Sequence, residues 1–245
     1  MILKNKIDGE YKLERLDKVI ASQGKYSRKD VKKLASSKRI LVNDKIANKT
    51  DIKVDPEVDV IKIDGEELFV RKYLYLVLNK PKGYVSATKD NKDKTVLELV
   101  PKELFNKDLF PAGRLDKDTT GLMIITNDGM FAHDILSPRK HVDKTYLVTI
   151  DIETNEEMVK GFLEGVKLND GVCKSSKMEI VDFNKAIVTL SEGRYHQIKR
   201  MFGCFGAKVV ELHRLSMGHL SIPKDLKVGE CRELKQEEIE LIKQR

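Results

Sequence analysis

Residues 113–126 read Gly113-Arg114-Leu115-Asp116-Lys117-Asp118-Thr119-Thr120-Gly121-Leu122-Met123-Ile124-Ile125-Thr126. The apolar side chains at 122–125 predict a buried strand over residues 122–126. Two glycines bracket one arginine, two aspartates and two threonines just before this strand. Polar residues held against a core strand often belong to a functional site. From spacing alone, however, we favour a simpler role for Asp116 and Asp118, hydrogen bonding to the backbone of a tight turn.

Further predicted elements lie on both sides of this strand. Apolar or alternating runs predict strands over residues 74–78, 145–150, 178–181 and 186–190, and helical spacing predicts helices over residues 130–136, 196–205 and 237–243. The first of these strands is followed by Asn79-Lys80-Pro81-Lys82-Gly83, which has the composition of a turn. Strands and helices do not alternate regularly. We therefore expect an α+β domain built on a mixed or antiparallel sheet.

The N-terminal quarter has a different pattern, typical of a small separate module. Apolar residues recur at helical spacing from Leu13 to Ile20, and Gly24 follows as a helix stop. A capping box that starts at Ser27 begins a second helix. Asn43-Asp44 between two short apolar runs predicts a hairpin, and residues 58–63 predict another strand. We expect two short helices with a small sheet, joined to the larger domain by a linker within residues 64–73.

Positive charge is concentrated in this N-terminal module. The formal net charge is +7 overall and +5 within residues 12–72 alone. Residues 25–39 contain seven basic residues and a single acid, Asp30. Such density indicates a polyanionic partner, although a solvated helix face accounts for the charge about equally well.

Composition and cysteine usage exclude several classes of protein. No run approaches the ~20 apolar residues of a transmembrane helix, and residues 1–12 lack the apolar stretch of a signal peptide. Cys173, Cys204 and Cys231 are scattered and odd in number, which fits neither a disulfide framework nor a zinc site. We expect a soluble, cytoplasmic protein from a reducing compartment, with no membrane association and no structural metal.

Two more polar segments flank the predicted core strands. Lys144-Thr145-Tyr146 begins the strand at 145–150, and taken alone its tyrosine is most simply a core or edge residue. The segment from Glu192 to Phe202 places four basic or titratable residues near the start of a helix. Taken alone, it is most simply a cationic helix face.

Together these segments resemble the pseudouridine synthases, and within them the RsuA branch that acts on ribosomal RNA. The resemblance rests on four segments: Leu78-Asn79-Lys80-Pro81 with Gly83, Gly113-Arg114-Leu115-Asp116 with Thr120-Gly121-Leu122, Lys144-Thr145-Tyr146, and Gly193-Arg194-Tyr195-His196-Gln197-Ile198-Lys199-Arg200. The second of these, the catalytic-aspartate motif, is highly specific.

The N-terminal module resembles the RNA-binding domain named after ribosomal protein S-four. The matching segments are Arg15-Leu16-Asp17-Lys18-Val19-Ile20-Ala21, Ser27-Arg28-Lys29 and Ile40-Leu41-Val42-Asn43-Asp44. The two resemblances cover nearly the whole chain from residue 13. We expect an RNA-binding domain over residues 13–70, a catalytic domain over residues 71–245, and an N-terminal extension, residues 1–12, to which we assign no role.

The resemblance to the synthases implies a role for each matching site residue. Asp116 corresponds to the catalytic aspartate, and Asp118 is then secondary, a turn residue. Tyr146 corresponds to the tyrosine that stacks on the target base, and Lys199 to the basic partner of the aspartate. Arg114 corresponds to a basic side chain that helps to hold the flipped-out site open.

The implied reaction accounts for these residue types without a cofactor or a metal. Uridine loses a nitrogen–carbon glycosidic bond and regains a carbon–carbon bond at ring carbon 5, and no atoms enter or leave. A carboxylate such as Asp116 can attack the sugar or the base, or take a proton from the sugar, and the sequence does not distinguish these routes. Lys199 nearby favours the ionised carboxylate that each route needs. Tyr146 offers a flat face to the freed base.

The resemblance to the S-four-type domain implies an RNA-binding face on its second helix. Such a face supplies phosphate contacts, which position an RNA without specifying its sequence. The residues at the RNA-facing positions are Arg15, Lys25, Ser27, Arg28, Lys29 and Lys32.

Three segments resemble the small-subunit enzymes more than their large-subunit relatives. They are Ser137-Pro138-Arg139-Lys140-His141, Tyr195-His196-Gln197-Ile198-Lys199-Arg200-Met201-Phe202 and Gly229-Glu230-Cys231-Arg232-Glu233-Leu234. We therefore expect an enzyme that acts on one uridine of 16S rRNA, at position 516 in the usual rRNA numbering, in naked rRNA or in a small-subunit assembly intermediate. Nothing in the sequence suggests an obligate dimer seam, and we expect a monomer. The alternatives are the same reaction on 23S rRNA or tRNA, and an rRNA-binding assembly factor without catalysis. A fused methyltransferase would need a glycine-rich cofactor loop after a strand, and we find none in a suitable context.

Overall fold

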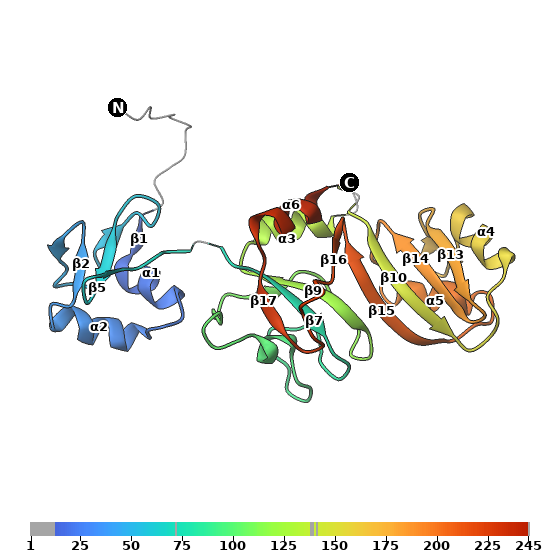
Figure 1. Cartoon of the computed structure of the whole chain (residues 1–245), viewed down its shortest axis with the longest axis horizontal. Coiled ribbons are helices and arrows are strands. Elements are labelled where there is room, and N and C mark those ends of the chain that lie inside the picture. The colour runs from blue at the N-terminus through green and yellow to red at the C-terminus, as the bar shows by residue number, and fades with distance from the viewer. Residues whose placement is uncertain (1–12, 72, 138–139, 141, 245) are drawn as a thin grey trace, which may run out of the picture. The chain divides into compact units, whose positions relative to one another are not determined.

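The computed structural model in Figure 1 describes residues 13–71, 73–137, 140 and 142–244. The N-terminal extension, residues 1–12, lies outside this range, as do Pro138, Arg139 and His141 of one segment that favours the small-subunit enzymes. Contacts divide the described chain into two compact units. The first comprises residues 13–71 with Phe105–Lys107, and the second comprises the remaining described residues.

The N-terminal unit packs two helices against short strands. The helices are α1 (Leu16–Ser22) and α2 (Arg28–Ser36). A four-stranded sheet has the order β3-β2-β5-β6, formed by Lys45–Ile46, Ile40–Val42, Ile61–Ile63 and Glu66–Glu67, and β1 (Glu14–Arg15) pairs separately with β4 (Lys53–Val54). Leu16, Ile20 and Val31 from the helices meet Ile40 and Ile61 from the sheet in one buried cluster.

The structure confirms two features of this unit that short sequence motifs predicted, a helix cap and a hairpin turn. Ser27 caps α2 and forms the predicted capping box with Asp30. The hairpin turn occurs at Asn43 and Asp44, whose φ angles of 50° and 61° are those of the tight turns that match strand twist.

Three expectations for this unit were wrong. Leu13 is half-exposed and lies outside α1, because Arg15 is extended and pairs with Lys53 in the short β1–β4 sheet. Val58 is exposed in a turn, so the strand there begins only at Ile61. Glu66–Glu67, placed in the linker, instead pairs with β5 through backbone hydrogen bonds that their polar side chains did not reveal.

The second unit is built on a mixed nine-stranded sheet, which confirms the α+β class. Its main strands follow the order β13-β14-β10-β15-β9-β7-β17, with β8 (Phe110–Pro111) beside β9 and β16 (Leu220–Ser221) beside β15. Only β15 and β9 are parallel neighbours. The main strands are, in that order, Lys177–Asp182, Lys185–Leu190, Lys144–Ile150, Val209–Met217, Thr120–Thr126, Tyr75–Lys80 and Cys231–Glu233.

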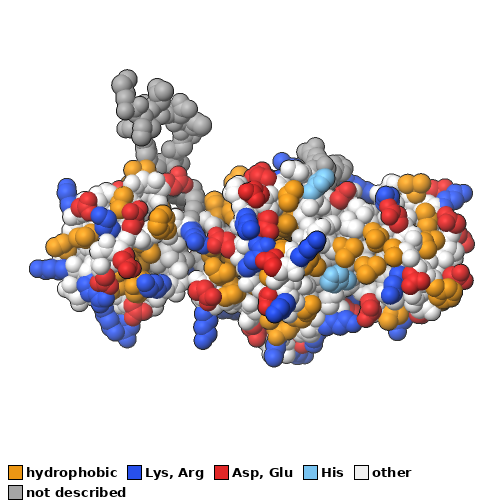
Figure 2. Space-filling model, in the orientation of Figure 1, with side chains coloured by type: hydrophobic (Ala, Val, Ile, Leu, Met, Phe, Trp, Pro, Cys, Tyr) orange, Lys and Arg blue, Asp and Glu red, His pale blue; other side chains and the backbone are white. Residues whose placement is uncertain are grey.

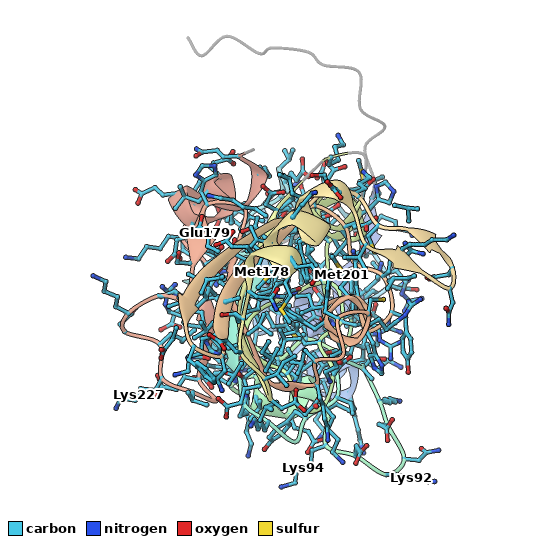
Figure 3. The ribbon with its side chains drawn as sticks, turned by 90° about the vertical axis from the view of Figure 1, so that its right-hand side faces the viewer. Lys92, Lys94, Met178, Glu179, Met201 and Lys227 are labelled. Carbon is cyan, nitrogen blue, oxygen red and sulfur yellow. The ribbon has the colours of Figure 1, made fainter. Side chains whose placement is uncertain are left out.

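Helices cover the two halves of this sheet separately, as Figure 1 shows. One half, with β10, β13, β14 and β15, packs against α4 (Glu156–Glu164) and α5 (Gln197–Gly203). Met178 from the sheet and Met201 from α5 share that core, where Figure 3 shows them close together. The other half, with β7 and β9, packs against α3 (Gly129–Leu136) and α6 (Gln236–Lys243) on one face and the short helix η1 (Val96–Leu99) on the other. A small hairpin, β11 (Lys167–Leu168) with β12 (Gly171–Val172), stands apart from the sheet.

The two halves join through a short parallel contact that requires a glycine. Strands β15 and β9 pair only at His213–Thr120 and Arg214–Gly121. A Cβ added to Gly121 would lie 2.3 Å from the backbone oxygen of Arg214, and the φ of Gly121 is +104°. Any side chain here would force the halves apart. The polar segment 113–119 therefore reaches the sheet at this junction.

The sequence misplaced or missed several elements of this unit. Asn79 and Lys80 were assigned to a turn but continue β7, and the turn begins at Pro81. Helix α4 was missed although Asn155 caps it. Strand β15 was missed because its polar residues, such as Glu211 and Arg214, interrupt the apolar pattern. Among the described residues, no helix is both long enough and apolar enough to cross a membrane.

Candidate active site

A cavity of about 670 Å³ opens between the loop that precedes β9, strands β10 and β15, and the start of α5. All four of the residues predicted to be catalytic, Arg114, Asp116, Tyr146 and Lys199, line it. The structure thus brings together side chains that lie up to 85 positions apart in the sequence. No group of three or more His, Cys, Asp and Glu side chains within the described residues is arranged to hold a metal ion.

Asp116 is held from two sides by nitrogen groups of α5 and its N-terminal cap. The Nζ of Lys199 lies 2.9 Å from Oδ2 of Asp116, and the Nε2 of His196 lies 3.3 Å from Oδ1. The carboxylate is 29% exposed, so it remains open to the cavity while both contacts hold it.

Lys199 bridges Asp116 to Asp118. Its Nζ lies 2.9 and 3.0 Å from the two carboxylate oxygens of Asp118. Partial burial disfavours the ammonium, but the hydrogen bonds and charges of the two aspartates outweigh it and raise the pKa of Lys199. Partial burial also disfavours the Asp118 carboxylate, but the Lys199 contact lowers the pKa of Asp118 overall. Asp118 lies in the turn, as expected, and its carboxylate also binds the ammonium of Lys199.

Lys80, which the sequence pattern placed in a turn, holds the loop that carries Asp116 by hydrogen bonds to its backbone. Lys80 is fully buried, and its Nζ donates to the backbone oxygens of Asp116 at 3.0 Å and Thr119 at 2.7 Å. Burial lowers the pKa of Lys80 to about 8, although Asp118 and Asp116 act in the opposite direction. A lysine at the end of an apolar run, directly before a proline, was the signal in the sequence.

Ser86 holds the same loop from another side. Its hydroxyl donates to the backbone oxygen of Leu115 at 2.7 Å and accepts from the backbone nitrogen of Leu115 at 2.9 Å. Lys80 and Ser86 together constrain the backbone on each side of the Asp116 side chain. A fixed backbone limits how far the carboxylate can move during a reaction.

Tyr146 presents an aromatic ring at the cavity from the middle of the sheet. It lies on β10, opposite Val188 of β14 and Arg214 of β15. The ring packs against the apolar cores of both halves of the sheet and is partly buried. Tyr146 therefore contacts both apolar cores and also forms part of the cavity wall, a position inside the sheet and not at its edge.

His196 is a site residue that sequence reasoning left within a cationic helix face. It caps α5 in a left-handed conformation, with a φ of 47°, and its ring stacks on that of Tyr195 with centroids 3.8 Å apart. A non-glycine residue with positive φ often marks a functional position. This conformation turns His196 toward Asp116, three residues before Lys199.

Arg194 and Arg200, also taken as part of that face, are ion-paired with the β11–β12 hairpin. Arg194 Nη2 lies 2.6 Å from an oxygen of Asp170, and Arg200 contacts the same carboxylate. Hydrogen bonds from Arg200, and then from Arg194, hold the pKa of Asp170 well below its usual range. Of this pair, only Arg194 also lines the cavity.

Two further buried cations line the cavity and were not predicted. Lys144 donates to the backbone oxygens of Val142 at 2.6 Å and Ile135 at 3.1 Å, and burial lowers its pKa to about 8. Arg214 donates from Nε to the backbone oxygen of Leu122 at 2.6 Å. In the sequence, Lys144 stands out only as the residue that begins the tyrosine motif, and no local pattern marks Arg214.

The residues predicted to bind RNA divide into two groups in the N-terminal unit. Lys25, Arg28, Lys29 and Lys32 are exposed on or beside α2, and Figure 2 shows basic side chains gathered at the lower margin of this unit, where Figure 1 places that helix. Ser27 is occupied as the helix cap, accepting from the backbone nitrogen of Asp30. Arg15 is half-exposed and binds both oxygens of the buried Asp17.

Comparisons with known proteins agree with this arrangement. A sequence profile described as RNA pseudouridylate synthase matches residues 74–203, and one described as S4 domain matches residues 14–60. Ribosomal small subunit pseudouridine synthase A of Escherichia coli is 42% identical over 92% of this chain and 98% of its own. An uncharacterized RNA pseudouridine synthase of Bacillus subtilis, YtzG, is 41% identical over 93% of this chain and 98% of its own.

A crystal structure titled pseudouridylate synthase is 38% identical and covers 93% of this chain and 99% of its own, with a TM-score of 0.65. The matched profile spans the Asp116 loop, the Tyr146 strand and helix α5, which form much of the cavity, while β15 lies beyond the matched residues. The chain therefore belongs to the RNA pseudouridine synthases, in the RsuA-type small-subunit branch, and carries an N-terminal S4 domain.

Proposed function

We propose that this enzyme converts one uridine of 16S rRNA, the position-516 type, into pseudouridine, without a cofactor and with Asp116 as the catalytic carboxylate. The observation that carries the proposal is the Asp116 carboxylate, which opens to the cavity while Lys199 and His196 bind it. The small-subunit target is supported by relatives named for that activity. The similarly close Bacillus relative has no assigned substrate, so the target needs its own test.

Each of the other predicted residues has a task in this proposal. Tyr146 stacks on the target base and keeps it in the cavity after the glycosidic bond breaks, an interaction worth about 1–3 kcal/mol. Lys199 supplies the counter-charge to Asp116. Arg114 helps to hold the flipped-out site open. Flipping a base costs a few kcal/mol, which phosphate contacts elsewhere in the protein can offset.

The N-terminal unit supplies such phosphate contacts in this proposal. Lys25, Arg28, Lys29 and Lys32 leave their charged ends in solvent, where an RNA backbone can reach them. Arg15 can join them with the part of its guanidinium that Asp17 leaves exposed. Because phosphate contacts carry no sequence information, the choice of uridine depends on RNA shape and on the cavity.

The proposed function is tested by site-resolved mapping of pseudouridine. Unmodified total rRNA and tRNA are incubated with the purified protein, with Asp116→Asn and Asp118→Asn as matched variants, because both carboxylates bind Lys199. We expect one new site in 16S rRNA that requires Asp116 and persists in Asp118→Asn. A site in 23S rRNA or tRNA would replace the proposed target and keep the reaction.

If no pseudouridine forms on naked RNA, the same assay is repeated on small-subunit assembly intermediates. A new site found only there would identify a ribonucleoprotein substrate. A second negative result, together with specific binding to rRNA, would favour a protein that assists assembly without catalysis.

A further inference from the structure

The wall of the cavity contains a buried guanidinium group that is only partly used. Arg214 is 3% exposed and lines the cavity from β15. Its Nε donates to the backbone oxygen of Leu122, but its Nη2 is buried and has no hydrogen-bond partner among the described residues. A buried polar group without a partner is costly, and one beside a binding cavity indicates a partner that arrives with the ligand.

The charges around Arg214 show what kind of partner this is. Lys80 and Lys144 are also buried, and the charge of Arg214 helps to lower the pKa of each. Their ammonium groups bind neutral backbone carbonyls. Of the acids at this site, Asp116 and Asp118 are bound by Lys199, and the charge of Asp143 acts on Lys144 in the opposite direction to that of Arg214. Two buried cations, Lys144 and Arg214, therefore line this side of the cavity, and the buried Lys80 binds the Asp116 loop next to it. These charges favour a ligand that carries negative charge.

Strand register places Arg214 beside the aromatic ring that is proposed to hold the base. Tyr146 and Arg214 are directly opposed residues of β10 and β15. Side chains of such cross-strand pairs lie within about 5 Å of each other at Cβ. A base stacked on the ring of Tyr146 would thus turn one edge toward the guanidinium.

The reaction creates negative charge on that base. The proposed function supplies this step, and the inference rests on it. When the bond between sugar carbon 1 and ring nitrogen 1 breaks, its electron pair stays with the uracil ring and spreads over nitrogen 1 and the two carbonyl oxygens. The ring then rotates, and carbon 5 forms the new bond to the sugar carbon. The proton on carbon 5 is released to a base and nitrogen 1 takes up a proton, so no atoms are gained or lost overall.

We propose that Arg214 is a catalytic residue that donates a hydrogen bond from its guanidinium to a carbonyl oxygen of the detached uracil and stabilises the negative charge of that ring. Nε anchors the group to Leu122, and Nη2 provides the donor. Because the anchor fixes its position before the substrate arrives, the donor needs no reorganisation when charge develops. Lys80 and Lys144 add to the positive potential without contacting the base.

The competing explanation is purely structural. The bond to Leu122 ties β15 to β9 at the glycine-requiring junction, so loss of Arg214 could simply loosen the sheet. Arg214→Gln and Arg214→Lys are therefore compared with Arg232→Gln. Arg232 also has one buried nitrogen without a hydrogen-bond partner, Nε, which lies 3.7 Å from a carboxylate oxygen of Asp225. It binds Glu238 and lies outside the cavity.

Turnover of wild type and variants is measured at several RNA concentrations, with thermal unfolding of each protein. For Arg214→Gln we expect kcat to fall by about 100- to 1,000-fold with KM little changed, as for other preorganised donors. We expect Arg214→Lys to retain more activity, and Arg232→Gln to lose stability without losing kcat. If Arg214→Gln loses activity only in proportion to its loss of folded protein, the residue is structural.

Leaving-group chemistry separates a catalytic from a structural role more directly. Fluorine at carbon 5 withdraws electrons and stabilises the negative charge of the detached base. Consumption of RNA that contains 5-fluorouridine should therefore suffer less from Arg214→Gln than consumption of RNA with uridine. An equal loss on both substrates would overturn the proposal.

A binding test is independent of turnover and therefore of the proposed function. Barbiturate has the shape of uracil and carries a negative charge at neutral pH. By calorimetry, wild type should bind barbiturate roughly 10- to 100-fold more tightly than uracil, the effect of one charged hydrogen bond, and Arg214→Gln should lose the preference. If wild type shows no preference, the inference fails even when the enzyme makes pseudouridine; if the preference is present but no RNA is modified, the proposed function fails alone.

Discussion

The two units of this enzyme hold their positive charge in opposite ways. The S4 domain exposes Arg28, Lys29 and Lys32 to solvent on helix α2. The apolar side of that helix packs against the core through Val31 and Leu34. The catalytic unit buries Lys80, Lys144 and Arg214 and binds each to backbone oxygens. Exposed cations act over a distance, are screened by salt and tolerate many arrangements of phosphate. Buried cations act only on atoms in direct contact and depend on exact geometry. Substitutions in the S4 domain should therefore change RNA binding, and substitutions in the catalytic unit should change kcat.

The largest effect is expected where the catalytic unit contacts the reacting atoms. Asp116→Asn removes the carboxylate but keeps the shape of the side chain. We expect activity to fall by at least ~10⁴-fold, as when other enzymes lose a nucleophile. RNA binding should remain near wild type, because the exposed cations of the S4 domain are untouched. Loss of binding in parallel with activity, measured by filter binding, would make Asp116 a structural residue.

A smaller effect is expected for the buried cation that positions the Asp116 loop. Lys80→Met removes the donor to the backbone oxygens of Asp116 and Thr119. We expect kcat to fall about 100-fold, since displacement by about 1 Å at a reacting group costs that much. The matched variant is Lys144→Met, which also removes a buried ammonium but leaves this loop intact. If kcat falls equally in the two variants, the loss comes from removing a buried charge and not from displacement of the Asp116 loop.

The exposed cations should change binding and its salt dependence, not the chemistry. Replacing Arg28, Lys29 and Lys32 by glutamine removes three phosphate contacts in this proposal. The slope of log affinity against log salt should become shallower by about 2–3, and kcat at saturating RNA should not change. The control is Lys62→Gln, which removes a lysine that already binds Asp44. A slope unchanged in the triple variant would remove α2 from the RNA interface.

The features that could be predicted from the sequence differ from those that could not in how far apart the contributing residues lie along the chain. The capping box of α2, the turn at Asn43-Asp44 and the strand over residues 122–126 were predictable because each depends on residues close in the sequence. The meeting of Asp116 with Tyr146 and Lys199 was expected only from the resemblance to a family, since no local rule joins positions that far apart.

The residues that were missed are polar groups inside the sheet. The sequence placed Lys80 in a turn and did not single out Arg214, because burial of a cation is rare and depends on carbonyl oxygens that are distant in the sequence. His196 was missed because its role follows from a left-handed cap conformation. Strand β15 was hidden for the same reason as Arg214, whose charge interrupts the apolar pattern of the strand.

The smallest expected effect concerns stability and pH, and it tests whether Lys144 is truly a buried cation. Its pKa in the folded protein is about 8, below the ordinary value of 10.5, chiefly because burial disfavours the charge. Between pH 8 and pH 10.5 the unfolded chain therefore binds more protons than the folded protein at this residue. The free energy of unfolding should rise with pH in that window, by up to about 1.4 kcal/mol per pH unit.

Urea unfolding of wild type and Lys144→Met at pH 7, 8, 9 and 10 isolates this contribution, because all other titrating groups are shared. The difference should be constant below pH 8 and should then move in favour of wild type as pH rises, since the folded lysine loses its buried charge and keeps a donor for Val142 and Ile135. Lys29→Met, which removes an exposed lysine, is measured beside it as the matched variant. A flat difference for Lys144→Met up to pH 10 would mean that water reaches its ammonium, and the contrast between buried and exposed charge would no longer hold at that position.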